Sequence, residues 1–261
     1  MSRFMDKLNQ VSQVMPQPMG FRAVSPVASK PKMLLVASLA GVDVKGPADY
    51  VAGADAGLLV ISKPGSEVRT FKKISQAVPA IPWGGWLRSI GSGEIEQMAK
   101  ADFDFVVFPA ATTSLTIVQN KEVGKILEVE ASLSEGLLKV VDELPVDAVL
   151  IGGEKKEGFT WHHLMLFQRF ADLLTKPLLV SIPSNVTANE LQALWEAGVA
   201  GVIVETGVGQ PVERVSNLRK VIDKLVSPPQ RRREKTEALL PYIGLERGEV
   251  AEEEEEEEEE E

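Results

Sequence analysis

From Met33 onwards, short apolar runs rich in β-branched residues alternate with longer stretches in which apolar residues recur at helical spacing. This alternation is typical of repeated strand–helix units whose strands run parallel. The pattern predicts eight strands, over residues 33–39, 57–62, 79–83, 104–109, 125–131, 147–152, 177–182 and 200–206.

The intervals between these strands carry helical periodicity and several helix boundary signals. Thr187 and Glu190 form a capping-box pattern ahead of an apolar stretch, and Pro211 suits a first helical position. Gly53 and Gly198 stand where helices should end. We expect helices over residues 46–53, 66–77, 92–100, 113–122, 134–144, 160–174, 187–197 and 211–225.

Eight parallel strands with crossover helices either close into a barrel or stay open as a doubly wound sheet. The number of strands favours closure. The first strand is not followed by the glycine-rich fingerprint of a dinucleotide-binding sheet. Gly91-Ser92-Gly93 precedes a predicted helix, but it lacks the third glycine and follows the third strand. The sequence therefore predicts an α/β fold, a (β/α)8 TIM barrel over residues 33–226.

Segments outside the predicted barrel differ from it in composition. In the extension 1–32, helically spaced apolar residues predict a short amphipathic helix over 3–15, which we expect to cap the bottom of the barrel. Residues 227–251 form a polar, proline-led linker with a short apolar patch at 238–245. Residues 252–261 are all glutamate, repel one another and bury no apolar surface, so we expect a disordered acidic tail.

The charge of the chain comes from this tail. The formal net charge is −10, with 38 acidic and 28 basic residues, and the tail alone supplies ten glutamates. The remaining body is neutral, which argues against a nucleic-acid partner. No run approaches the roughly 18 apolar residues that a membrane span needs. We expect a small-molecule ligand and leave a homo-oligomer open.

The absence of cysteine excludes disulfides, thiolate nucleophiles and Cys-ligated zinc, and it is compatible with a cytoplasmic location. Active sites of such barrels lie at the carboxyl ends of the strands. In the predicted strand 125–131, Leu127 and Val129 share one face, whereas Glu128 and Glu130 share the other. If the apolar face packs on the helices, both carboxylates point into the barrel, where they need a partner.

Two explanations of these carboxylates remain open. Glu130 with Glu154 would bind Mg²⁺ or Mn²⁺, which would polarise a carbonyl group and stabilise an enolate. Alternatively, Glu128 or Glu130 forms a structural ion pair with a lysine inside the barrel. Glu128, Glu205 and Lys63 are the candidate catalytic residues, the last two because they lie at the ends of other strands.

The remaining candidates are substrate-binding residues. Phosphate-binding loops often follow the last two strands of such barrels, and here the small or polar residues Asn185, Gly207 and Gly209 lie there. Ordinary turns are the simpler explanation, because glycines are common there and Glu205 would repel a phosphate. Trp83 and Trp86 flank a predicted Gly84-Gly85 loop and either line a ligand site or plug the barrel mouth. The candidate substrate-binding residues are Trp83, Trp86, Ser181, Asn185, Gly207 and Gly209.

His162 and His163 are adjacent at the start of a predicted helix, so their side chains diverge and cannot ligate one metal together. We expect a helix-start role for this pair.

Glu130 and the following Pro145–Gly153 run (PVDAVLIGG) resemble the metal-dependent aldolases of 2-keto acids, the family that includes citrate-lyase β-type enzymes. The runs 95–110 and 194–206 also resemble that family's repeated units. The resemblance implies a TIM barrel, a divalent metal held by Glu130, and carbon–carbon lyase chemistry on a keto acid.

Several family positions differ in this chain. Lys155 stands at the position of the second metal ligand, with Glu154 one residue earlier. The arginine that would bind the keto acid has no counterpart near Trp83, and residues 61–65 (ISKPG) replace a histidine. The sequence therefore leaves three functions open: an aldolase-type lyase, a barrel that has lost catalysis and serves in binding or scaffolding, and an enzyme that binds a phosphorylated metabolite.

Overall fold

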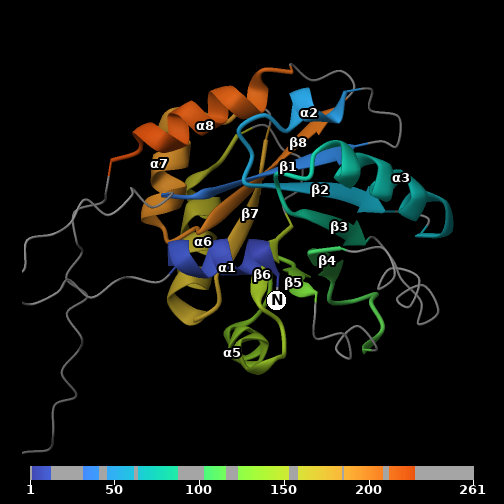
Figure 1. Cartoon of the computed structure of the whole chain (residues 1–261). Helices are drawn as coiled ribbons and strands as arrows, with labels where there is room; N and C mark the ends of the chain where they lie inside the picture. Colours follow the sequence, from blue (N-terminus) through green and yellow to red (C-terminus); the bar gives the residue numbers. More distant parts are fainter. Residues whose placement is uncertain are drawn as a thin grey trace, which may run out of the picture. The chain divides into compact units, whose positions relative to one another are not determined.

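The computed structural model of the chain (Figure 1) describes nine stretches of the sequence. These are residues 2–12, 32–40, 46–61, 64–87, 103–115, 123–152, 158–183, 185–207 and 212–226. All of them lie within one compact unit, Met1–Val226. The predicted linker and acidic tail lie outside the described residues.

Eight parallel strands pair in sequence order and close on themselves, since β1 also pairs with β8. The strands are β1 Leu34–Ala40, β2 Ala56–Ile61, β3 Trp83–Leu87, β4 Phe105–Pro109, β5 Gly124–Val129, β6 Ala148–Ile151, β7 Leu178–Ile182 and β8 Gly201–Gly207. This closed barrel confirms the predicted fold class.

Helices surround the barrel (Figure 1). They are α1 Arg3–Ser12, α2 Pro47–Tyr50, α3 Pro64–Ala77, α5 Glu135–Glu143, α6 Trp161–Leu173, α7 Ala188–Glu196 and α8 Arg214–Lys224. The capping box of Thr187 and Glu190 is confirmed at the start of α7. Gly53 and Gly198 adopt left-handed conformations (φ 89° and 94°) just after α2 and α7. The predicted helix 92–100, most of 113–122 and Pro211 lie outside the described residues.

The prediction for the third strand was wrong. It placed the strand at 79–83 and a loop at Gly84-Gly85, but β3 begins at Trp83 and contains both glycines. These glycines make room for neighbouring side chains: a Cβ on Gly84 would lie 2.4 Å from the Phe105 ring, and one on Gly85 would lie 2.9 Å from Ile61. Glycine suggested a turn in the sequence, whereas close packing requires it in the strand.

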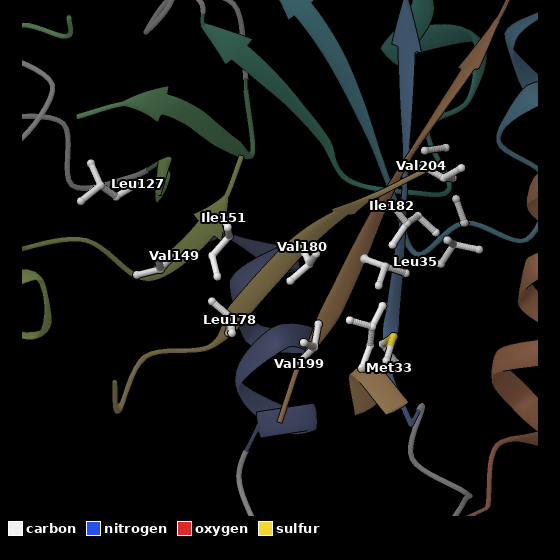
Figure 2. Close-up of a cluster of buried hydrophobic side chains, with 14 of the residues drawn as sticks. Met33, Leu35, Leu127, Val149, Ile151, Leu178, Val180, Ile182, Val199 and Val204 are labelled. Carbon is white, nitrogen blue, oxygen red and sulfur yellow. The ribbon is translucent and has the colours of Figure 1, made fainter. Parts of the chain in front are cut away.

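Each strand alternates between two buried sets of side chains, because successive residues point to opposite faces. One set faces the helices, and Figure 2 shows part of it. Its members include Leu35, Leu127, Val149, Ile151, Leu178, Val180, Ile182 and Val204. The other set faces the barrel axis and includes Leu34, Val36, Leu58, Phe105, Val107, Ile126, Leu150, Leu179 and Ile203. These two sets fix which polar residues point inward.

Helix α1 closes the end of the barrel at which the strands begin. Phe4 and Leu8 are fully buried with the inward-facing set, and the Phe4 ring stacks on Phe105 at 4.4 Å between centroids. Small residues at the start of other strands, such as Ala56 in β2 and Ala148 in β6, belong to the same cluster. Their small side chains leave the space that α1 fills.

Asp104 holds the start of α1. Its Oδ2 accepts hydrogen bonds from the Ser2 hydroxyl (2.8 Å) and the Phe4 amide (2.9 Å), and its Oδ1 accepts one from the Arg3 amide (2.8 Å). These amides belong to the first turn of the helix, which has no backbone partners of its own. An aspartate from the start of β4 therefore caps a helix about a hundred residues away.

Glu190 links the start of α7 to the segment before α6. Its Oε2 accepts hydrogen bonds from the Thr187 amide (2.7 Å) and hydroxyl (2.8 Å), and its Oε1 accepts one from the Phe159 amide (3.0 Å). Burial acts to raise the pKa of this carboxyl group, but the hydrogen bonds from Phe159 and Thr187 together outweigh it. The pKa of Glu190 therefore lies below its ordinary value of 4.5.

We expect Glu190→Gln to remove part of the acid sensitivity of folding. Because the folded-state pKa is depressed, ionised Glu190 stabilises the fold above the unfolded-state pKa, and this contribution disappears as pH falls through the folded-state value. Thermal unfolding from about pH 6 to about pH 3 measures the effect. The Tm difference between wild type and variant should shrink with acidification, whereas exposed Glu143→Gln should show no such trend. A pH-independent difference for Glu190→Gln would contradict the assignment.

In the described part of the chain, every helix is too short or too polar to cross a membrane.

Candidate functional site

Solvent reaches the barrel interior at the end where the strands finish. In six strands a single residue is only partly buried, and in each case that residue faces the axis near the carboxyl end of its strand. These residues are Val60, Trp86, Pro109, Glu128, Ser181 and Glu205. Active sites of TIM barrels are built at this end.

The strand register places four inward residues at one height. In such barrels the interior is layered, with four side chains per layer from alternate strands. Residues at one height are found by going from each residue to its register partner on the next strand and then one residue toward the carboxyl end. Starting at Ser38, this path passes through Leu59, Trp86, Phe108, Glu128, Ile151, Ser181 and Val204 and returns to Ser38. The inward members of this circuit are Ser38, Trp86, Glu128 and Ser181, which we call the polar layer.

Glu128 is held within the polar layer by a hydrogen bond. The indole Nε1–H of Trp86 reaches past β4 and donates to Glu128 Oε2 at 2.8 Å. The other oxygen, Oε1, lies over Gly152, where an added Cβ would come within 2.7 Å of it. Leu127 and Val129 lie in the helix-facing set, so the predicted inward direction of Glu128 is confirmed.

The two serines of the polar layer have free hydrogen-bonding capacity. Ser38 is only 2% exposed, while Ser181 is partly buried. Within the described residues, neither hydroxyl has a hydrogen-bond partner. Ser181 was a predicted substrate-binding residue, but Ser38 was missed. The residues around Ser38 are all apolar, so the sequence carries no signal of which face of the strand it occupies.

Glu205 occupies the next layer toward solvent and lies near Arg214, the first residue of α8. The Arg214 guanidinium donates to the carbonyl oxygens of Glu205 (3.3 Å) and Pro183 (3.2 Å), so it joins the ends of β8 and β7. Burial lowers the pKa of Arg214 below its ordinary value, and the charge of Glu205 partly offsets that effect. Sequence reasoning did not single out Arg214.

The structure does not bring Glu130 into the interior with Glu128. Strand β5 ends at Val129, and Glu130 is exposed and accepts a hydrogen bond from Ser132 (3.2 Å). The expectation of two inward carboxylates therefore holds only for Glu128. The strand had been predicted to run to residue 131, and its early end explains the difference.

Trp83 is also misplaced by the sequence prediction. It faces the helices, is 4% exposed, and donates its indole N–H to the Val78 carbonyl at 2.9 Å. Trp83 and Trp86 are not neighbours around a loop but belong to one strand and point to opposite faces. Trp83 is therefore a core residue, and Trp86 alone of the two reaches the polar layer.

The remaining candidates are divided between described and undescribed residues. Asn185 is exposed in the turn after β7, and Gly207 ends β8 with φ 135°, a conformation that favours glycine. Lys63, Glu154 and Gly209 lie outside the described residues. The predicted metal pair of Glu130 and Glu154 thus stays a prediction. Among the described residues, no three His, Asp or Glu side chains are grouped so as to hold a metal ion.

The histidine pair lies at the start of α6. His163 takes part in a capping box with Thr160: its Nδ1 lies 3.1 Å from the Thr160 amide, which donates to it. His162 is exposed. The expected helix-start role is confirmed for His163.

No protein-family model matches the chain, and no curated protein matches its sequence. Solved structures do resemble it. Thiamine phosphate pyrophosphorylase from Pyrococcus furiosus shares 12% identity over 75% of this chain and 98% of its own, with a TM-score of 0.57. A mutant tryptophan synthase α-subunit from the same organism shares 13% identity over 74% and 97%, with a TM-score of 0.58.

Orotidine 5'-phosphate decarboxylase from Pyrococcus horikoshii OT3 is similar at 14% identity, over 73% of this chain and 99% of its own, with a TM-score of 0.56. At such low identities these likenesses establish the architecture and leave the chemistry to the site itself. The chain is a TIM-barrel protein.

Proposed function

We propose that the chain is an enzyme that moves a proton next to the carbonyl group of a small molecule, with Glu128 as the general base. The observation that carries the proposal is the position of Glu128: inward, partly exposed, at the carboxyl end of the barrel, and fixed by Trp86 through one oxygen. A base must be both accessible and oriented. The hydrogen bond from Trp86 leaves Oε1 to meet the substrate.

The chemistry follows from that arrangement. Glu128 takes the proton from the carbon beside the carbonyl, the C–H electron pair moves toward the carbonyl oxygen, and an enolate forms. The protonated Glu128 carboxyl group exchanges its proton with solvent, and transfer of this solvent-derived proton to carbon completes an exchange. In a carbon–carbon lyase of the aldolase type, the same base removes the proton of a hydroxyl group, and the electrons of the broken C–C bond pass to the carbonyl. Lyase activity on a keto acid is therefore a specific form of this proposal.

No step is assigned to a metal ion. Glu130 is exposed and bonded to Ser132, and one oxygen of Glu128 already accepts the Trp86 N–H. The other oxygen, Oε1, is the one that the mechanism assigns to the substrate. The described donor set thus gives the Mg²⁺ or Mn²⁺ hypothesis no support, and the mechanism rests on the carboxylate.

Proton exchange in D₂O tests the proposal without knowledge of the full reaction. We expect the protein to exchange the C–H protons beside the carbonyl in at least one member of a panel of pyruvate, 2-ketobutyrate, glycolaldehyde and dihydroxyacetone, followed by ¹H NMR. Glu128→Gln should slow the exchange by at least about 100-fold, because general-base catalysis typically contributes that much. The glutamine retains an oxygen that can accept the Trp86 N–H.

Glu143→Gln, on the exposed side of α5, is the matched control and should exchange at the wild-type rate. Exchange by Glu128→Gln at the wild-type rate would rule out Glu128 as the base. A wild-type protein that binds a panel member without exchanging it would instead support the alternative of a barrel that only binds its ligand.

A second candidate function is catalysis on a phosphorylated metabolite. The observation that favours it is Arg214, a cation at the first turn of α8 that contacts the ends of β7 and β8. Helix N-termini favour phosphate groups. The names of two similar proteins, thiamine phosphate pyrophosphorylase and orotidine 5'-phosphate decarboxylase, include a phosphate compound. Comparing dihydroxyacetone with its phosphate ester in the same exchange assay separates the two candidates, since a strong preference for the ester would favour this one.

A further inference from the structure

Ser38 is a buried polar residue for which the fold itself gives no reason. The inward positions below it on β1 are Leu34 and Val36, and the same layers on other strands hold apolar residues or glycine. Polar residues this deep in a protein are normally hydrogen-bonded, so a serine at this position needs an explanation. Alanine would occupy the same position without introducing a polar group.

The position of Ser38 supplies the explanation. Ser38 and Ser181 lie in the polar layer with Glu128, and Ser181 is the layer neighbour of both. Hydroxyl groups donate hydrogen bonds without carrying charge. Two such donors facing a carboxylate in one layer form a set that can hold an oxygen atom of a ligand while the adjacent carbon meets the base.

We infer that Ser38, together with Ser181, binds an uncharged carbonyl or hydroxyl oxygen of the substrate within the polar layer. This inference rests on the proposed function, because it assigns the end of the substrate that enters the barrel. Glu128 would repel an anionic group at this depth. A carboxylate or phosphate of the substrate therefore points outward, toward the mouth of the barrel, and the class of ligand is a small carbonyl compound with at least one uncharged oxygenated end.

As enolate character develops, the oxygen held by the serines gains negative charge. Hydrogen bonds to it strengthen in the transition state, which is the way that neutral donors assist acyl and enolate chemistry. Ser38 is then a catalytic residue in the sense that it touches the reacting group.

Ser38→Ala tests the inference, with dihydroxyacetone and pyruvate as probes and saturation-transfer NMR as the measure of binding. We expect the apparent Kd to rise severalfold, up to about tenfold, since a lost hydrogen bond to an oxygen of the ligand has an effect of that order. The Tm should change little, because no described residue forms a hydrogen bond with this hydroxyl. Ser181→Ala should weaken binding in the same direction. Ser75→Ala on the outer helix α3, at a partly buried position whose hydroxyl donates to the Lys72 carbonyl, is the control and should match the wild type.

Wild-type affinity in Ser38→Ala, or binding of neither probe by the wild-type protein, would overturn the inference. A marked fall in Tm would do the same, because it would show that the hydroxyl has a structural role. Binding that depends on Ser38 without any proton exchange would leave the inference standing and contradict only the role of Glu128 as a base. Exchange that persists in Ser38→Ala at the wild-type rate would contradict the inference and leave that role intact.

Discussion

Replacing Phe4 by alanine is expected to lower the free energy of unfolding by about 3–5 kcal/mol, the range for removing a buried phenylalanine side chain. Phe4 is fully buried and stacks on Phe105 inside the barrel. The small residues Ala56 and Ala148 of the same cluster cannot expand to fill the space. A cavity would therefore remain at the closed end. Urea unfolding followed by circular dichroism measures the change.

Met165→Ala provides the control for this variant. Met165 is 68% exposed on α6, so its truncation should change the free energy of unfolding by less than about 0.5 kcal/mol. If Phe4→Ala changed the free energy of unfolding as little as Met165→Ala does, α1 would not close the barrel in solution.

Asp104→Ala should lower the free energy of unfolding by about 3 kcal/mol, because three hydrogen bonds of roughly 1 kcal/mol each are lost. The Ser2 hydroxyl and the amides of Arg3 and Phe4 lose their acceptor at the start of α1. Asp6→Ala, an exposed position on the same helix, is the control and should have little effect. The measurement is again urea unfolding.

The two variants should not be additive. Once Asp104 no longer holds the start of α1, Phe4 is less firmly seated, and its removal then has a smaller effect. The double variant should therefore be destabilised by less than the sum of the single changes. Full additivity would indicate that Asp104 and Phe4 stabilise the protein independently, against the description of α1 as one docked unit.

Much of this fold was predictable from the hydrophobic pattern. Runs such as 177–182 and 200–206 are mostly apolar and contain β-branched residues, as expected for strands buried on both faces, and β7 and β8 lie within one residue of them. The capping box at Thr187 was equally clear, because its signal is local. The third strand was not predictable, because Gly84 is required by Phe105, a residue distant in sequence.

The candidate site was predictable only in part, for a similar reason. Alternation along one strand predicts that Glu128 faces inward, and this was correct. It does not predict where the strand ends, which leaves Glu130 outside the barrel. The membership of Ser38 in the polar layer depends on the register of all eight strands, and Trp86 reaches Glu128 across β4. Such relations are properties of the closed barrel and not of any single segment.

The measurement that tests the central claim most directly is an NMR titration of the ¹⁵N-labelled protein with dihydroxyacetone or pyruvate, in which the Trp86 indole N–H is assigned by its loss in Trp86→Phe. The account predicts that this resonance shifts on binding, together with the backbone amides of Ser38, Glu128 and Ser181. The account would be contradicted if the Trp86 indole resonance stayed unchanged at saturating ligand while resonances of residues elsewhere, such as those on the outer faces of α5 and α6, shifted.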